Sequence, residues 1–544
     1  MTWPWKQARP CSWLILLCLA ACQGKAPVIP ILPMSVPDGV LRVGVASLPA
    51  STDPALTPAY DSGIARTAFE ALLKPKPDLS DVQPAAAASY EVSAGGLTYT
   101  FHLRPAGRWS DGAAVKAQEF VGAWKRILDP RVNSPVAELF AQRLKNAAAY
   151  ETLDPKKDAD RIPAFLDGLG LKAADDRTFV VQLAGPAPDF KWIASVPAGA
   201  PARGDAPPAG SGPGPGNGPF RLDSLTKDRA VLLPNDHYWA GRPHLARVEL
   251  SLQGEAAADL ARFKQQQEEL TSTSGAGAVA VSADGGLSRN LTRMPRLEEL
   301  WAQFNVHKPP FDNPKVRLAF AQAIDRDALV RDLEGGAALP ALGPVPKGLR
   351  DYRPELAAQR FDAAGARNTL DSSGEAPAAL DGIHLLVRDL PADRALATFL
   401  VTQVKEHLGI QLVLDAQPSP NVTKLLANGG FEVQAPGGWL GDFPDERDWL
   451  DLFQTLNFSG QWSRYSSAGY DRLVQQADTQ PELTRRLQLY AQAQQLLAQD
   501  APVAFLYQPE AWNLRQPYVL GVTYTPLDDW PGDVYAGDIS IAAH

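Results

Sequence analysis

Cysteine is nearly absent from this chain of 544 residues. The three that it has, Cys11, Cys18 and Cys22, all lie within the first 22 positions. No disulfide can therefore form in the body of the protein, which must be stabilised by a large hydrophobic core even in an oxidising compartment. The same absence excludes a cysteine nucleophile or a cysteine metal site in that body.

Motifs of the common hydrolases and nucleotide-binding enzymes are also missing. The sequence has no HExxH, no GxSxG and no phosphate-binding loop. Its seven histidines are scattered, and the closest pair, His237 and His244, is not spaced as two ligands on one helix face. We therefore expect a protein that is not an enzyme and that has no cofactor and no metal site.

Long apolar runs and basic runs are absent from the body as well. No stretch after the amino terminus is long enough to cross a bilayer. The net charge is -9, with acidic and basic residues interspersed, which argues against nucleic acid as a partner. More than 500 residues remain after Cys22, which predicts two or three domains, and thirteen tryptophans are available to their cores and to a ligand cleft.

The amino terminus has the pattern of a lipoprotein signal peptide. Two basic residues, Lys6 and Arg9, precede a short apolar run at 13–19, and small residues then lead to Cys22. The pattern predicts cleavage before Cys22, which would carry lipid and tether the protein to a membrane. The alternative is an ordinary secretory signal in which Cys22 is incidental.

Hydrophobic periodicity predicts a mixture of strands and helices. Strands are expected at 41–46 and 98–103, and helices at 61–73, 117–127, 394–407 and 483–499, the last with Leu483, Tyr490 and Leu497 turned inward. Two segments rich in small residues, 195–219 and 271–288, are expected to be loops. Strands alternating with helices indicate lobes of the α/β class.

One cluster of residues, at 437–445, suits the binding of a cation. Its glycines, Gly438 and Gly441 among them, permit close approach of the backbone, and Trp439 and Phe443 flank the carboxylate of Asp442. A carboxylate beside aromatic faces favours an ammonium group through charge-assisted hydrogen bonds and cation–π attraction. The alternative is a tight surface turn in which Asp442 only forms the turn.

Five segments, in order along roughly residues 40 to 530, resemble the extracellular solute-binding proteins of peptide-type ABC importers, the oligopeptide- and dipeptide-binding family. No single motif is decisive, and the order of the five carries the resemblance. The segments are 99–126 with its Trp-Ser-Asp-Gly turn, 171–188, 217–239 with Asn-Gly-Pro-Phe, 305–326 beginning at Asn305, and 408–477 with the Gly-Trp…Asp cluster.

The resemblance implies an α/β fold like that of the type II periplasmic binding proteins, with two main lobes around a hinged cleft and an inserted extra domain. Hinge closure between domains I and III would enclose the ligand. The implied division is a signal peptide at 1–21, a tether at 22–39, domain I at 40–75, 198–298 and 518–544, domain II at 76–197, and domain III at 299–517.

The resemblance also implies a function and a set of ligand-binding residues. Asp442 matches the family's aspartate that pairs with the α-ammonium of a peptide, and Trp439, Gly438, Gly441, Phe443 and Asn305 are expected beside the ligand. The implied partners are a peptide, the permease subunits of an ABC importer and, through Cys22, a membrane. The implied state is a monomer in the periplasm or cell envelope.

Two departures from the family leave the ligand and the membrane open. Some oligopeptide binders have an arginine for the peptide carboxylate just before the Gly-Trp pair, where this chain has Pro436 and Gly437. The ligand could therefore be a longer peptide, a capped one or a non-peptide solute. Gln23, rather than an aspartate, follows Cys22, so inner and outer membrane both remain possible. A surface lipoprotein of this fold that serves as sensor or adhesin without transport is a further alternative.

Overall fold

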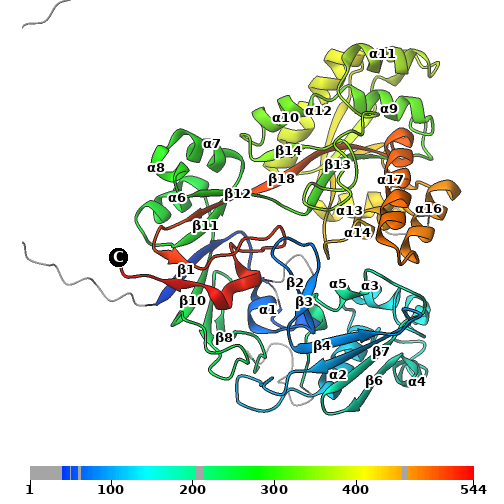
Figure 1. Cartoon of the computed structure of the whole chain (residues 1–544). Helices are drawn as coiled ribbons and strands as arrows, with labels where there is room; N and C mark the ends of the chain where they lie inside the picture. Colours follow the sequence, from blue (N-terminus) through cyan, green and yellow to red (C-terminus); the bar gives the residue numbers. More distant parts are fainter. Residues whose placement is uncertain (1–38, 50, 59–62, 204–213, 456–462) are drawn as a thin grey trace, which may run out of the picture.

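The computed structural model describes residues 39–49, 51–58, 63–203, 214–455 and 463–544. The signal peptide, Cys22 and the tether up to residue 38 lie outside the described residues. In the described part, the chain forms three bodies, which we call lobe I, domain II and lobe III (Figure 1).

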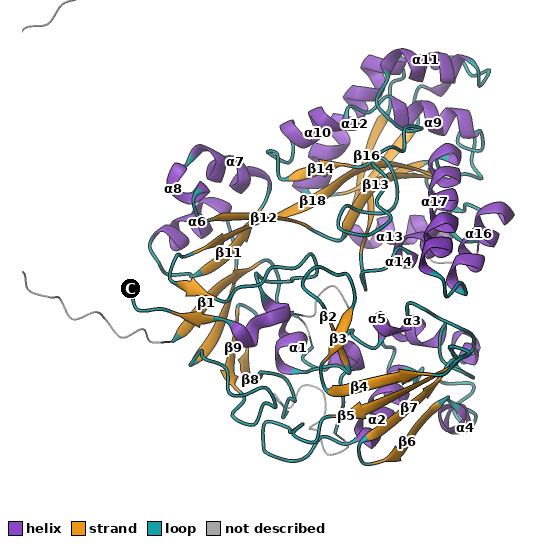
Figure 2. Cartoon of the chain, in the orientation of Figure 1, coloured by secondary structure: helices purple, strands orange, loops and turns teal. Residues whose placement is uncertain are grey.

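Lobe I contains strands from three separate stretches of the chain. β1 pairs in parallel with β10 and β11, and β8, β9 and β10 form an antiparallel meander beside it. Its helices lie against this sheet (Figure 2). The elements are β1 (Val40–Val45), α1 (Gly63–Ala68), β8 (Phe220–Leu225), β9 (Arg229–Pro234), β10 (Arg247–Leu252), α6 (Ala256–Lys264), β11 (Leu270–Thr273), α7 (Gly275–Ala283), α8 (Gly285–Ser288), β12 (Leu291–Pro295), β19 (Val519–Leu520) and β20 (Ser540–Ile541).

Domain II is a four-stranded antiparallel sheet, in the order β4-β5-β7-β6, packed on helix α2. Aromatic rings fill the space between helix and sheet: the ring of Trp124 lies edge-on to Phe140 and Phe179 at 5.0 and 5.1 Å. The elements are β4 (Ala87–Val92), β5 (Thr98–Leu103), α2 (Ala117–Ile127), α3 (Ala137–Ala141), α4 (Ile162–Gly168), β6 (Leu171–Asp175), β7 (Thr178–Gln182) and α5 (Phe190–Ile193); the hairpin β2 (Leu73–Pro75) and β3 (Val82–Pro84) lies between this domain and lobe I.

Lobe III is a mixed sheet flanked by helices. β17 pairs antiparallel with β13 and parallel with β15, which itself pairs with β16. The elements are β13 (Glu298–Phe304), α9 (Pro314–Gln322), α10 (Arg326–Asp332), β14 (Ala338–Pro340), α11 (Ala363–Asp371), β15 (His384–Arg388), α12 (Pro391–Leu408), β16 (Val413–Gln417), α13 (Ser419–Asn428), β17 (Val433–Leu440), α14 (Arg447–Leu450), α16 (Ala468–Asp478) and α17 (Leu483–Asp500).

The two lobes share one long strand, β18 (Val503–Arg515). Its first half pairs with β13 in lobe III, and its second half pairs with β11 and β12 in lobe I. The passage from β12 to β13, through Arg296 and Leu297, runs antiparallel to it. The buried amide of Gln508 on β18 donates to the carbonyls of Arg296 and Lys347, both at 2.8 Å, and so ties these crossing segments together. We call this crossing the hinge.

Several predicted elements are confirmed, namely the strands near 41–46 and 98–103 and the helices at 117–127, 394–407 and 483–499. Helix 61–73 is wrong in its second half, because α1 ends at Ala68 and the chain then extends into β2. There the carbonyl of Leu72 accepts from the backbone of Ala85 and Ala87, which holds the segment extended.

Two further predictions need correction. Segment 271–288 is not a loop but contains α7 and α8, because Ala278, Val281 and Leu287 pack on the buried rings and side chains of Trp512 and Leu514. Tertiary packing here overrides the weak helix propensity of glycine. On α17, Tyr490 and Leu497 are buried as expected, but Leu483 is exposed and Arg486 is buried in its place. In the described part of the chain, no helix is long and apolar enough to cross a membrane.

Candidate functional site

The segment that follows β17 is held in a compact loop by Asp448. The Oδ2 atom of Asp448 accepts from the backbone N–H of Asp442 at 2.7 Å and from the indole of Trp439 at 3.3 Å. A methyl group at Gly441 would collide with the ring of Trp449, so only glycine fits there. The loop therefore fixes the position of Asp442 through contacts that do not use its carboxylate.

The carboxylate of Asp442 is mostly buried, and no described residue forms a hydrogen bond or an ion pair with it. Burial raises the pKa of the Asp442 carboxyl to about 7. Burial, together with the nearby charge of Asp442, raises the pKa of Asp448 well above its ordinary value. Two neighbouring desolvated carboxyl groups without a cation favour a positively charged ligand group beside them.

Asp442 lines a small cavity between lobe I and lobe III, which we call the inner cavity. Its walls are the segment 69–75 of lobe I, residues 195–197 of domain II, residues 526–529, the hinge residues Arg296 and Leu297, and the loop 440–444. The volume is about 70 Å³. Pockets for small molecules usually enclose a few hundred Å³. The inner cavity as described is therefore too small to enclose a peptide.

A larger cleft of about 790 Å³ adjoins the inner cavity and lies between domain II and lobe III. We call it the outer cleft. Val136 and Leu139 line it from domain II, and α13, β17 and α14 line it from lobe III. Leu440, Asp442 and Phe443 line both spaces. A ligand with one group bound to Asp442 could thus extend into the inner cavity or into the outer cleft.

The structure brings most of the predicted site residues together. Gly438, Trp439 and Asp442 line the outer cleft, and Gly441 lines the inner cavity. Phe443 lines both, and its buried ring packs into the hydrophobic core of domain II, so it joins lobe III to that domain. Whether these side chains contact a ligand stays a prediction.

Asn305 lies apart from this group. It follows β13, and its buried amide donates to the carbonyls of Gly429 at 3.0 Å and Phe431 at 3.2 Å. It also borders an open surface pocket beside His307 and Arg464. Among the described residues, its amide supports the turn before β17, and a contact with ligand stays untested.

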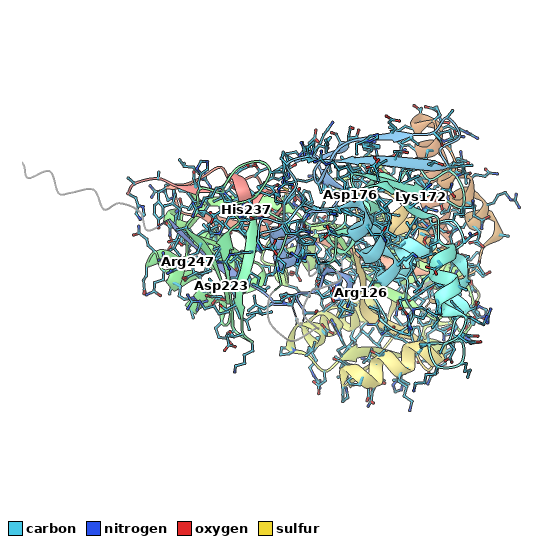
Figure 3. The ribbon with its side chains drawn as sticks, turned by 90° about the horizontal axis from the view of Figure 1, so that it is seen from below. Arg126, Lys172, Asp176, Asp223, His237 and Arg247 are labelled. Carbon is cyan, nitrogen blue, oxygen red and sulfur yellow. The ribbon has the colours of Figure 1, made fainter. Side chains whose placement is uncertain are left out.

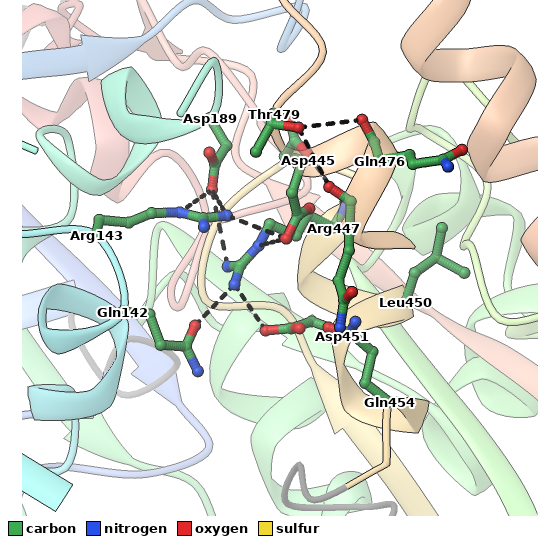
Figure 4. A network of polar contacts seen from close by, with 12 residues as sticks. Gln142, Arg143, Asp189, Asp445, Arg447, Leu450, Asp451, Gln454, Gln476 and Thr479 are labelled. Carbon is green, nitrogen blue, oxygen red and sulfur yellow. Dashed lines mark hydrogen bonds and ion pairs between the residues drawn. The ribbon is translucent and has the colours of Figure 1, made fainter. Parts of the chain in front are cut away.

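An ionic network, which the sequence analysis missed, joins domain II to lobe III (Figure 4). The guanidinium of Arg447 on α14 donates to Asp451 at 2.8 Å and to Asp478 at 3.1 Å, both in lobe III. It also donates to the amide of Gln142 in domain II at 2.8 Å and lies 3.8 Å from Asp189. Gln142, Arg447 and Asp451 also line the outer cleft, so the network connects its two sides.

The domain II side of this network contains a buried ion pair. Arg143 donates to the buried carboxylate of Asp189 at 2.9 Å. Burial opposes the ionisation of Asp189, but Arg143 and Arg447 outweigh it and hold the pKa of that carboxyl below its ordinary value. Because these charges are buried, removing one of them would leave its partners uncompensated.

Comparison with known proteins shows which protein family this chain belongs to. Residues 81–461 match the family model described as bacterial extracellular solute-binding proteins, family 5 middle. The probable deoxycholate-binding periplasmic protein of Escherichia coli K12 is 28% identical over 554 residues, which cover 98% of this chain and 99% of that protein. The oligopeptide-binding protein of Bacillus subtilis 168 is 26% identical, over 86% of this chain and 87% of that protein.

Solved structures show the same fold. The murein tripeptide-binding protein of Escherichia coli superposes with a TM-score of 0.76 at 26% identity, covering 93% of this chain and 99% of that one. The prediction of an α/β fold of the type II periplasmic-binding-protein kind is confirmed.

Proposed function

Because the chain belongs to the bacterial extracellular solute-binding proteins of family 5, we propose that it captures peptides between its lobes and delivers them to an ABC importer. The carboxylate of Asp442 is the observation that carries the choice of ligand. It lines both spaces between the lobes, is mostly buried and has no partner among the described residues. The α-ammonium of a peptide supplies the missing charge.

The names of the relatives leave two ligand classes to decide between. Relatives from several bacteria are named oligopeptide- or dipeptide-binding proteins, and another is named a probable deoxycholate-binding protein. Deoxycholate is an anion without an amino group. It would leave Asp442 unpaired and would add a negative charge beside it, so the environment of Asp442 favours the peptide.

Blocking the amino group of a peptide tests this choice. The purified mature protein should bind tri-alanine, and N-acetyl-tri-alanine should bind about 100-fold or more weakly, because a buried carboxylate loses its counter-charge. Isothermal titration calorimetry measures both affinities, with deoxycholate as the third titrant. Equal binding of the two peptides, or tight binding of deoxycholate alone, would show that the ligand is not chosen through its ammonium group.

We further propose that the protein is a lipoprotein anchored through Cys22 and that it acts as a monomer in the periplasm or cell envelope. The sequence pattern before Cys22 supports the anchor, and periplasmic relatives support the compartment. A sensor or adhesin of the same fold without transport is the competing role. A deletion of the associated permease would abolish peptide uptake under the first role and leave the second role intact.

Lipid attachment predicts a specific defect on substitution of Cys22. The Cys22→Ser variant should remain as an unprocessed precursor or be released in soluble form, since serine cannot receive the thioether-linked lipid. Detergent phase partitioning and mass spectrometry of the amino terminus measure this, with Cys18→Ser as the matched control. Unchanged processing and partitioning of Cys22→Ser would refute the anchor.

A further inference from the structure

The inner cavity is lined by seven charged side chains, and five of them are already satisfied by the protein. Arg66 pairs with Asp533 at 3.0 Å, and Arg296 pairs with Glu298 at 3.1 Å. Asp528 accepts from the hydroxyl of Thr525, and Asp529 accepts from the backbone of Gly63. The fifth is Glu70, whose two oxygens accept from the hydroxyl of Tyr238 at 2.5 Å and from the indole of Trp239 at 2.6 Å.

The two that remain are opposite in sign. One is the carboxylate of Asp442. The other is the ammonium of Lys74 on β2, for which no described residue provides a hydrogen-bond acceptor or an ion-pair partner. Its Nζ lies 3.9 Å from the ring centroid of Tyr535. Burial lowers the pKa of Lys74, although the nearby charges of Glu70, Asp538 and Asp533 act in the opposite direction.

The surroundings of Lys74 hold it in place on the cavity wall. β2 pairs with β3, with Lys74 opposite Gln83. The side chain of Gln83 donates to the hydroxyl of Tyr535 at 2.8 Å, and that hydroxyl donates to the carbonyl of Pro75 at 2.7 Å. The ring under the ammonium is therefore fixed from both strands of the hairpin. An aromatic face attracts a cation but does not accept its three N–H groups as an anion would.

We propose that Lys74 binds a carboxylate of the ligand, so that the inner cavity selects ligands that carry an ammonium and a carboxylate together. This proposal rests on the proposed function, because it assumes that the ammonium is held by Asp442. It assigns the anionic end of the ligand to lobe I, whereas Pro436 and Gly437 leave lobe III without a cation before the Gly-Trp pair. The carboxylate can be the terminus of a short peptide or an acidic side chain.

The test compares three tripeptides on wild type and Lys74→Met. The probes are tri-alanine, tri-alanine amide and Ala-Glu-Ala amide, measured by calorimetry. Lys74→Met should weaken tri-alanine about 10- to 100-fold, as expected for a lost charged hydrogen bond. It should barely change the amide, which has no carboxylate. A loss for Ala-Glu-Ala amide as well would identify a side-chain carboxylate as a second source.

Two further variants make the result specific. Lys74→Arg keeps the charge and should retain at least part of the affinity. Lys172→Met removes an exposed lysine from β6 of domain II (Figure 3), which does not line the cavity, and should bind like wild type. If tri-alanine binds wild type and Lys74→Met equally, the proposal is overturned while the proposed function stands. If none of the tripeptides binds wild type, the proposed function fails and this proposal fails with it.

Discussion

Replacing Asp442 by asparagine should weaken the binding of tri-alanine by on the order of several hundred-fold at pH 8. The variant keeps the shape of the side chain and removes its charge, so the ligand ammonium would be buried without a partner, at a cost of about 3–5 kcal/mol. Calorimetry on wild type and Asp442→Asn measures the loss. N-acetyl-tri-alanine is the control ligand, because it should bind both proteins with similarly low affinity.

The pH dependence of binding provides a second signature of the same residue. The pKa of the Asp442 carboxyl is raised to about 7 by burial in the unliganded protein. The ammonium requires the ionised form, so the affinity of wild type should fall about tenfold per unit as the pH drops below 7. Asp442→Asn has no such carboxyl, and its affinity should stay nearly constant over that range. A pH-dependent affinity that persists in Asp442→Asn would exclude this assignment.

The raised pKa of Asp442 also predicts that Asp442→Asn does not lose stability, so a loss of binding in this variant would not be due to unfolding. Between its ordinary value of 3.8 and about 7, the folded protein holds a proton that the unfolded chain releases, so this group makes the unliganded protein less stable as the pH rises. At pH 8 the ionised Asp442 therefore lowers the free energy of unfolding of the unliganded protein. Unliganded Asp442→Asn should therefore unfold at the same temperature as wild type or at a higher one.

The second large effect is expected at Arg447. Arg447→Met keeps an unbranched apolar stem but removes the guanidinium that binds Asp451 and Asp478, which should cost about 3–5 kcal/mol. Asp189 keeps its ion pair with Arg143. Because part of this network crosses from domain II to lobe III, the variant should also be more open. We expect a larger radius of gyration in small-angle X-ray scattering without ligand, and weaker binding of tri-alanine.

Two further variants distinguish the effect of the contacts between domain II and lobe III from an effect on the stability of lobe III. Gln142→Ala removes the closer of the two domain II partners of Arg447 and leaves Asp189 in place, so it should open the protein in part, with little change in the unfolding of lobe III. Arg485→Met on the exposed side of α17 is the matched control and should behave like wild type. Scattering profiles that are identical for wild type, Arg447→Met and Gln142→Ala would show that the network does not hold the bodies together.

The local sequence pattern was sufficient to predict many helices and strands, but not the structure of segments that pack between the lobes and domain II. The period of apolar residues predicted α2 and α17, since each helix buries mostly apolar side chains on one of its faces. The segment after Ala68 also has apolar residues at helical spacing, yet it packs between lobe I and domain II as an extended chain. The burial of Arg486 has the same origin: its partner Asp445 lies in a distant segment.

Some residues of the candidate site could be predicted from the sequence, and others could not. Asp442, Trp439 and Gly441 could be predicted because they share one short segment whose composition suits a cation. Asp448 lies in the acidic run just after them, which was a usable signal. Lys74 and the network could not be found, because contacts such as Arg447 with Gln142 join residues 305 positions apart. Only the fold determines that such residues meet.

The hinge has a mechanical consequence for the whole molecule. β18 is hydrogen-bonded to strands of both lobes, with a register shift between Leu300 and Trp301 of its partner β13, and the amide of Gln508 joins it to Arg296. The hinge closure that the resemblance implies would therefore twist this shared sheet near Arg296 and Leu297. Those two residues also form part of the wall of the inner cavity. A molecule in the cavity would contact these two residues, so we expect ligand binding to make the connection between the lobes more rigid.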